Sequence, residues 1–150
     1  MSRKTKTLIL ALALLTVVAA GGFSLGLGLA YSLPIGNLPG GIMFSLKLDE
    51  VPFILGLNYS LQDTFRVGAT ADWWLATGNL VGFINYYLGP GLYAGIGDDT
   101  FDVGLRVPIG INMYPIPEFE LFIEIAPAIP FFPNFPQPFA QAAGGFRFWF

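Results

Sequence analysis

The stretch Ala142-Ala143-Gly144-Gly145-Phe146-Arg147-Phe148-Trp149-Phe150 ends the chain, and it decides which fold the sequence predicts. Its three phenylalanines recur at every second residue, so in a β-strand they share one face, while Arg147 and Trp149 take the other. A strand this apolar is a poor ending for a soluble sheet, because no residue follows to cover it. It suits a barrel strand whose outer face meets lipid. A buried last strand of a soluble sheet is the alternative interpretation.

Composition excludes several classes of protein. The 150 residues include 19 Gly and 12 Pro, which would be costly in a helical bundle, and they include no Cys and no His. A disulfide framework and a thiolate site are therefore impossible. Histidine is the usual general base near neutral pH, so nucleophilic triads are excluded as well. We predict that the protein is not an enzyme and that it holds no metal or cofactor.

The N-terminus has the pattern of a secretory signal peptide. Three basic residues among the first six precede the apolar run 8–18, and small residues follow at Val18-Ala19-Ala20. An uncleaved helical anchor is the alternative. We expect 1–20 to be the signal peptide and 21–150 to be a single domain. The domain then carries four basic and ten acidic side chains, so it is no candidate for binding nucleic acid.

The remaining chain divides into segments of alternating side chains separated by turn residues. They span 23–32, 42–49, 53–60, 65–75, 84–96, 103–114, 120–129 and 142–150. Most are long enough to cross a bilayer on a slant, and no helix separates them. An even number of such strands predicts an all-β fold, an eight-stranded antiparallel up-and-down transmembrane β-barrel.

The number of strands also predicts an orientation. The last strand of such a barrel ends in the periplasm, and an even count places the start of the first strand there too. The extracellular connections are then 33–41, 61–64, 97–100 and 130–138. The expected periplasmic turns are 49–52, 76–79 and 115–118.

The two faces of these segments differ in side-chain size. One set is almost entirely Leu, Ile, Val and Phe, whereas the other holds Gly, Ala, Ser, Thr, Asn and charged residues. Eight strands enclose little room, so the bulky set is expected outside, against lipid. A charge on the lipid face would cost about 2–4 kcal/mol at the membrane midplane. The charged residues of the small set predict an ionic network in the lumen: Lys47, Arg66, Asp72, Arg106, Glu120, Glu124 and Arg147.

Within this network we expect specific pairs across neighbouring strands. Arg106 should face Glu124, Arg147 should face Glu120 or Glu124, and Lys47 should face Asp72. The alternative is that some of these groups lie at the rims in water, where an ion pair contributes little.

Three prolines interrupt the pattern. Pro90, Pro108 and Pro127 fall in the middle of predicted strands, although proline cannot donate a hydrogen bond to a neighbouring strand. We expect bulges or kinks at these positions.

Several motifs stand out along the chain, namely Gly104-Leu105-Arg106-Val107-Pro108-Ile109-Gly110, Leu121-Phe122-Ile123-Glu124-Ile125-Ala126-Pro127 and Gly145-Phe146-Arg147-Phe148-Trp149-Phe150, with Asp72-Trp73-Trp74 and Tyr86-Tyr87 upstream. They resemble a family of small spirochaete-type outer-membrane barrels of unknown function. Members of that family look like the eight-stranded outer-membrane protein A and X barrels. The resemblance implies a location in the cell outer membrane and supplies no catalytic residues. The loops are short and the stretch 130–138 is rich in proline. These features differ from those of an adhesin, which would need long surface loops.

The closing strand also resembles the C-terminal signal that the barrel-assembly machinery reads, with Phe146, Phe148 and Phe150 as the signal residues. The expected partners are therefore outer-membrane lipid, this machinery and an unidentified extracellular ligand, and the protein should be a monomer. We expect a small integral outer-membrane barrel with a structural or surface-interaction role. Two alternatives stay open, namely a secreted or periplasmic barrel that binds a lipid or small apolar ligand, and a narrow channel.

Overall fold

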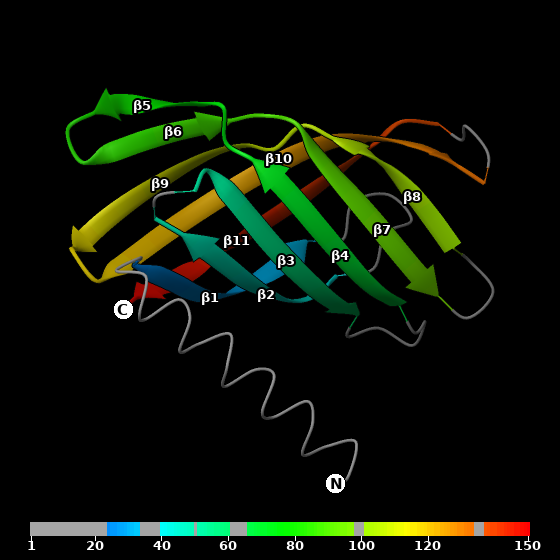
Figure 1. The fold of residues 1–150 in the computed structure, drawn as a ribbon, viewed down its shortest axis with the longest axis horizontal. Helices are drawn as coiled ribbons and strands as arrows, with labels where there is room; N and C mark the ends of the chain where they lie inside the picture. Colours follow the sequence, from blue (N-terminus) through cyan, green and yellow to red (C-terminus); the bar gives the residue numbers. More distant parts are fainter. Residues whose placement is uncertain (1–23, 34–39, 50, 61–65, 98–100, 134–136) are drawn as a thin grey trace, which may run out of the picture.

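The described part of the chain is an antiparallel sheet of eleven strands (Figure 1). This computed structural model describes residues 24–33, 40–49, 51–60, 66–97, 101–133 and 137–150. The signal peptide predicted at 1–20 lies outside the described residues, as does most of the four expected extracellular connections. The strands are β1 (Leu25–Leu33), β2 (Gly41–Leu48), β3 (Phe53–Ser60), β4 (Arg66–Trp73), β5 (Ala76–Val81), β6 (Ile84–Leu88), β7 (Gly91–Gly97), β8 (Phe101–Arg106), β9 (Ile109–Ile116), β10 (Phe119–Phe132) and β11 (Phe139–Trp149). None of the described residues belongs to a helix long and apolar enough to cross a membrane.

Eleven strands replace the predicted eight because two predicted segments are each divided and one predicted turn is a strand. The segment 84–96 becomes β6 and β7, and 103–114 becomes β8 and β9, while β5 follows β4 where a turn was expected at 76–79.

The turn predicted at 76–79 is wrong, because Ala76–Val81 forms strand β5 against β6. The chain reverses later, at Gly82, where φ is 56°, a value that suits glycine. Asn79, which indicated a turn in the sequence, instead donates its side-chain amide to the carbonyl of Gly82, 2.8 Å away. The residue therefore supports the turn from within the strand.

The three prolines lie along one line across neighbouring strands. Pro90 separates β6 from β7, Pro108 separates β8 from β9, and Pro127 lies in β10 where its partner changes from β9 to β8. Each proline carbonyl accepts a hydrogen bond from the adjacent chain: Trp73 N to Pro90 O at 2.8 Å, Gly89 N to Pro108 O at 3.2 Å and Val107 N to Pro127 O at 2.9 Å. Since proline lacks an N–H, it is accommodated where the ladder is interrupted.

Strand pairing returns to its starting point. The order β11-β1-β2-β3-β4-β7-β8-β10 is completed by a pairing of β10 with β11, and β9, β6 and β5 branch from the first half of β10. The closing strand β11 pairs with the first strand β1, with Gly26 opposite Trp149. Each residue of a strand has an opposite residue on the neighbouring strand. A path that starts at Trp149 of β11 and steps from opposite residue to opposite residue through all these strands returns to β11 at Phe139. The path therefore ends ten residues from where it started.

The two sets of side chains lie on opposite faces of the sheet, as the alternation predicts. Large apolar residues point outward, and Phe44 and Leu57 each keep 58% of their surface exposed. Charged residues point inward, where Arg147 and Glu120 are 1% and 0% exposed. The distribution is the reverse of that in a water-soluble sheet protein, whose charged groups are mostly exposed.

Two ends of the sheet are distinguished below. The terminal end is where β1 begins and β11 ends, and the loop end is where β4 begins and β7 ends. Because β11 runs to the terminal end and β10 is antiparallel to it, residues early in β10 lie near the terminal end.

Candidate functional site

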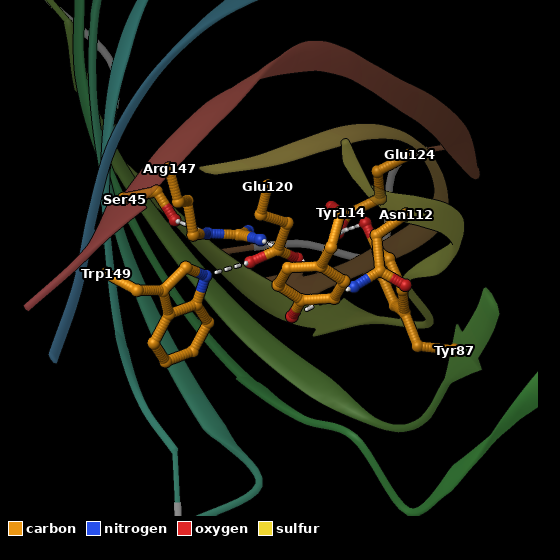
Figure 2. A network of polar contacts seen from close by, with 8 residues as sticks. All are labelled: Ser45, Tyr87, Asn112, Tyr114, Glu120, Glu124, Arg147 and Trp149. Carbon is orange, nitrogen blue, oxygen red and sulfur yellow. Dashed lines mark hydrogen bonds and ion pairs between the residues drawn. The ribbon is translucent and has the colours of Figure 1, made fainter. Parts of the chain in front are cut away.

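Glu120 is the centre of a polar cluster near the terminal end (Figure 2). Its Oε1 lies 2.8 Å from Nη1 of Arg147 and accepts a second hydrogen bond from the Asn112 side chain at 2.8 Å. Its Oε2 accepts from the indole N–H of Trp149 at 3.1 Å, while Nε of Arg147 donates to the Ser45 hydroxyl at 2.8 Å. Both charges are withdrawn from water, so this dense set of partners compensates for the lost hydration.

Arg106 joins a second cluster nearer the middle of the sheet. It forms an ion pair with Glu124 and a second one with Asp72, with Nε 3.0 Å from Oδ1. Its Nη1 also donates to the Gln141 side chain at 2.5 Å. Glu124 accepts a further hydrogen bond from the Tyr87 hydroxyl at 3.0 Å (Figure 2). One guanidinium therefore bridges two buried carboxylates on strands far apart in sequence.

Lys47 does not pair with Asp72, and this part of the prediction is wrong. Its ammonium lies over aromatic rings instead, 4.2 Å from the Trp74 ring centroid and 5.0 Å from that of Trp149. Lys47 and Asp72 do occupy one row across three strands, but the residue between them is Ile54, which is buried. Its side chain fills the space through which the two charges would have to meet.

Several contacts join two strands that lie on either side of a third, and they pass over a glycine in that middle strand. Gly91 lies opposite both Asp72 and Arg106, and a Cβ built on it would be 2.0 Å from the Asp72 carboxylate. Two further rows follow the same rule: Arg147–Gly28–Ser45 and Tyr87–Gly110–Glu124. The missing side chain of each glycine leaves the gap that the long polar groups cross.

Replacing Gly91 by alanine should therefore destabilise the protein by about 1–3 kcal/mol, the usual cost of overpacking. The new methyl group displaces the Asp72 carboxylate from Arg106. Gly68→Ala is the matched control, because its nearest neighbour, the Ala94 carbonyl oxygen, would be 3.6 Å from the new Cβ. Urea unfolding of both refolded variants measures the difference. Equal stability of the two variants would contradict the role assigned to Gly91.

Arg66 lies apart from both clusters, near the loop end. It pairs with Asp102 at 2.5 Å, and their side chains keep 27% and 20% of their surface exposed. Gly95 lies between them, since a Cβ there would be 2.8 Å from each group. This pair matches the rim alternative, in which water screens the charges.

Sequence reasoning missed several members of the network. Asp102 pairs with Arg66, and the uncharged partners Ser45, Tyr87, Asn112, Gln141 and Trp149 complete the two clusters. Each lies on the inward face by strand parity. For Asp102, Ser45 and Tyr87 the available signal was an inward polar residue two strands from a charge with glycine between, whereas Asn112, Gln141 and Trp149 offered only their inward position.

The network is suited to holding strands together. Its carboxylates are each occupied by a guanidinium or by hydrogen-bond donors. Within the described ranges there is no group of three His, Cys, Asp or Glu side chains able to hold a metal ion.

The pairing scheme can be compared with known structures. The chain is similar in fold to Neisserial surface protein A. The crystal structure of that protein aligns with a TM-score of 0.53 at 16% sequence identity, covering 86% of this chain and 97% of that chain. No protein-family model and no curated protein sequence matches the chain. At this identity the likeness concerns the fold alone, so the resemblance to small spirochaete barrels stays a prediction.

Proposed function

We propose that the protein is a small integral outer-membrane β-barrel with a structural or surface-interaction role. The observation that carries this proposal is that the outer face of the sheet is apolar and the inner face is charged, the reverse of a water-soluble sheet protein. Apolar side chains such as Leu57 and Ile123, which is 65% exposed, cover the outside, whereas Arg147 and Glu120 are buried inside. Lipid is the solvent in which this distribution is favourable, because an outward charge is costly there and an outward leucine is not.

Closure of the strand pairing supports a barrel of eight positions. In the proposed barrel the eleven strands correspond to eight positions, with β4 and β5, β6 and β7, and β8 and β9 each sharing one position. A ten-residue offset round the ring means that the strands tilt, by about 35–45° in barrels generally. No edge then remains within the ring itself, which a lipid environment requires.

The terminal end is assigned to the periplasm and the loop end to the exterior. This orientation follows from the closing strand, whose Phe146, Phe148 and Phe150 present the pattern expected of an assembly signal. Outer-membrane lipid and the barrel-assembly machinery are accordingly the proposed partners of a monomeric protein. The similarity in fold to Neisserial surface protein A supports a location at the cell surface.

The interior near the terminal end is filled, and this argues against both alternatives. Arg147, Glu120, Tyr87 and Phe122 are all at most 2% exposed, so they occupy the space that a lipid ligand or an ion would need. An apolar ligand would also have to displace paired charges, which is unfavourable.

Heat-modifiable gel migration tests the proposal. The full chain, expressed with its N-terminal segment and refolded in detergent, should migrate faster before boiling than after it, because a closed barrel resists the gel detergent. Membranes from the expressing cells should retain the protein through carbonate and urea washes. A protein that is released without detergent, or that migrates identically in both states, would contradict the proposal.

A further inference from the structure

The interior is filled at the terminal end and hollow at the loop end. Near the terminal end Trp74 stacks on Tyr87 with ring centroids 3.7 Å apart, and Phe122 is buried beside Ala30 and Ala143. Toward the loop end the inward residues are small, and they surround a cavity of about 70 Å3. We name this cavity the outer cup, and its lining includes Ser32, Asn58, Thr70, Tyr93 and Gln141, with Arg106 in the floor.

The charges near the outer cup already have partners in the protein. Arg106 is held by Glu124 and Asp72, and Arg66 by Asp102. An ion entering the cup would therefore meet no uncompensated charge of opposite sign. The cup is suited to a neutral ligand.

One hydroxyl in the lining makes no hydrogen bond of normal length to any described residue, although the Asp102 carboxylate interacts with it electrostatically. The Tyr93 side chain is 4% exposed and its hydroxyl oxygen is buried without a hydrogen bond. Leaving such a group unpaired costs about 1–3 kcal/mol. A ligand that forms a hydrogen bond with this hydroxyl would remove that cost. The cup therefore favours a ligand group that donates or accepts a hydrogen bond.

The rest of the lining narrows the chemical class. Hydroxyl and amide side chains such as Thr70, Asn58 and Gln141 can each donate and accept, which matches the hydroxyls of a ligand better than an ion. The lining also includes the apolar side chains of Met43 and Ala143, which add surface for the C–H groups of a ligand. A sugar ring presents both hydroxyl groups and C–H groups, so its surface matches this mixed lining.

We propose that the outer cup binds one neutral sugar residue, either free or at the end of a surface glycan. Because about 10–15 Å3 of such space holds one water molecule, the cavity has room for a group of several heavy atoms, such as a hydroxymethyl arm with neighbouring hydroxyls, while the rest of the ring stays outside. The inference rests on the proposed function, since the loop end must face the exterior for a surface sugar to reach it.

Saturation-transfer NMR on the refolded full chain tests this inference, in a detergent without a sugar headgroup. The probes are glucose, galactose, N-acetylglucosamine and inorganic phosphate, each titrated separately. We expect saturable transfer to at least one sugar and none to phosphate. Competition by an oligosaccharide ending in that sugar would assign the site to a glycan, and binding of the free sugar alone would assign it to a small solute.

Gly68→Leu is the variant that fills the cup. The new side chain has room to enter, because the nearest atoms to a Cβ at Gly68 are 3.6 and 3.7 Å away. Sugar affinity should fall at least tenfold. Ala71→Leu is the control, because Ala71 lies opposite the exposed Leu55 and Leu92 and enlarges the outer surface instead. This control should bind as the parent does.

Tyr93→Phe separates binding from folding. Removing an unpaired buried hydroxyl should leave the melting temperature unchanged or raise it, yet weaken sugar binding several-fold. The inference is overturned if no sugar binds, if phosphate alone binds, or if Gly68→Leu binds as tightly as Ala71→Leu. Heat-modifiable migration is recorded on every sample. A failure of the sugar site in a protein that still shows this migration leaves the barrel proposal intact.

Discussion

Replacing Arg147 by methionine should lower the free energy of unfolding by about 3–5 kcal/mol, the usual result of removing one partner of a buried ion pair. Glu120 is 0% exposed, and its carboxylate would lose its guanidinium partner while it keeps hydrogen bonds such as those from Asn112 and Trp149. Urea unfolding of the refolded variant, followed by tryptophan fluorescence, measures the loss. Adding Glu120→Gln should recover much of it, because the amide carries no charge that must be compensated.

Arg66→Met is the matched control for that experiment. Its ion pair with Asp102 is partly exposed, so water screens it and its loss should cost no more than about 1 kcal/mol. A similar loss in Arg66→Met and Arg147→Met would refute the distinction between the buried cluster and the rim pair. Export of Arg147→Met should be normal, because the phenylalanines of the closing strand are untouched.

Replacing Gly145 by valine should prevent the protein from reaching its closed form. A Cβ at Gly145 would lie 2.2 Å from the Leu29 carbonyl oxygen and 2.5 Å from the Ala30 Cα, both backbone atoms of β1. These atoms cannot move aside without separating β1 from β11, the pairing that joins the two ends of the chain. We expect most of the protein to lose heat-modifiable migration after refolding.

Gly144→Val is the control for the contact between β1 and β11. It adds the same side chain one residue away on the outward face, where the nearest atom would be 3.8 Å from the new Cβ. This variant should fold as the parent does. If both variants fold, or if both fail to fold, the steric explanation given for Gly145 against β1 is wrong.

The faces of the strands and the presence of most charges inside followed directly from the sequence. Side-chain alternation depends only on the geometry of each strand, so Arg106, Glu124, Arg147 and Glu120 could be placed inward without knowledge of the pairing. The interruptions at Pro90 and Pro108 were also visible as positions where a ladder donor is missing.

Specific contacts could not be predicted because they depend on the register between strands. Lys47 and Asp72 share a row, as an ion pair would require, but Ile54 stands between them. Asp72 meets Arg106 instead because Gly91 leaves the intervening position empty. No property of a single strand reveals which residue of its neighbour lies between two charges.

The ten-residue offset makes strand register a property of the whole ring. In an open sheet, the strands beyond an inserted residue can shift along their neighbours to accommodate it. Here the pairing closes on itself, so the shifts between neighbouring strands must together equal the ten-residue offset. A single insertion within a strand also turns the following side chains to the other face. A two-residue insertion keeps the faces but must change the tilt and width of the ring, unless another strand loses two residues. Length changes between homologous chains should therefore collect in the connections, or occur in strands as compensating pairs.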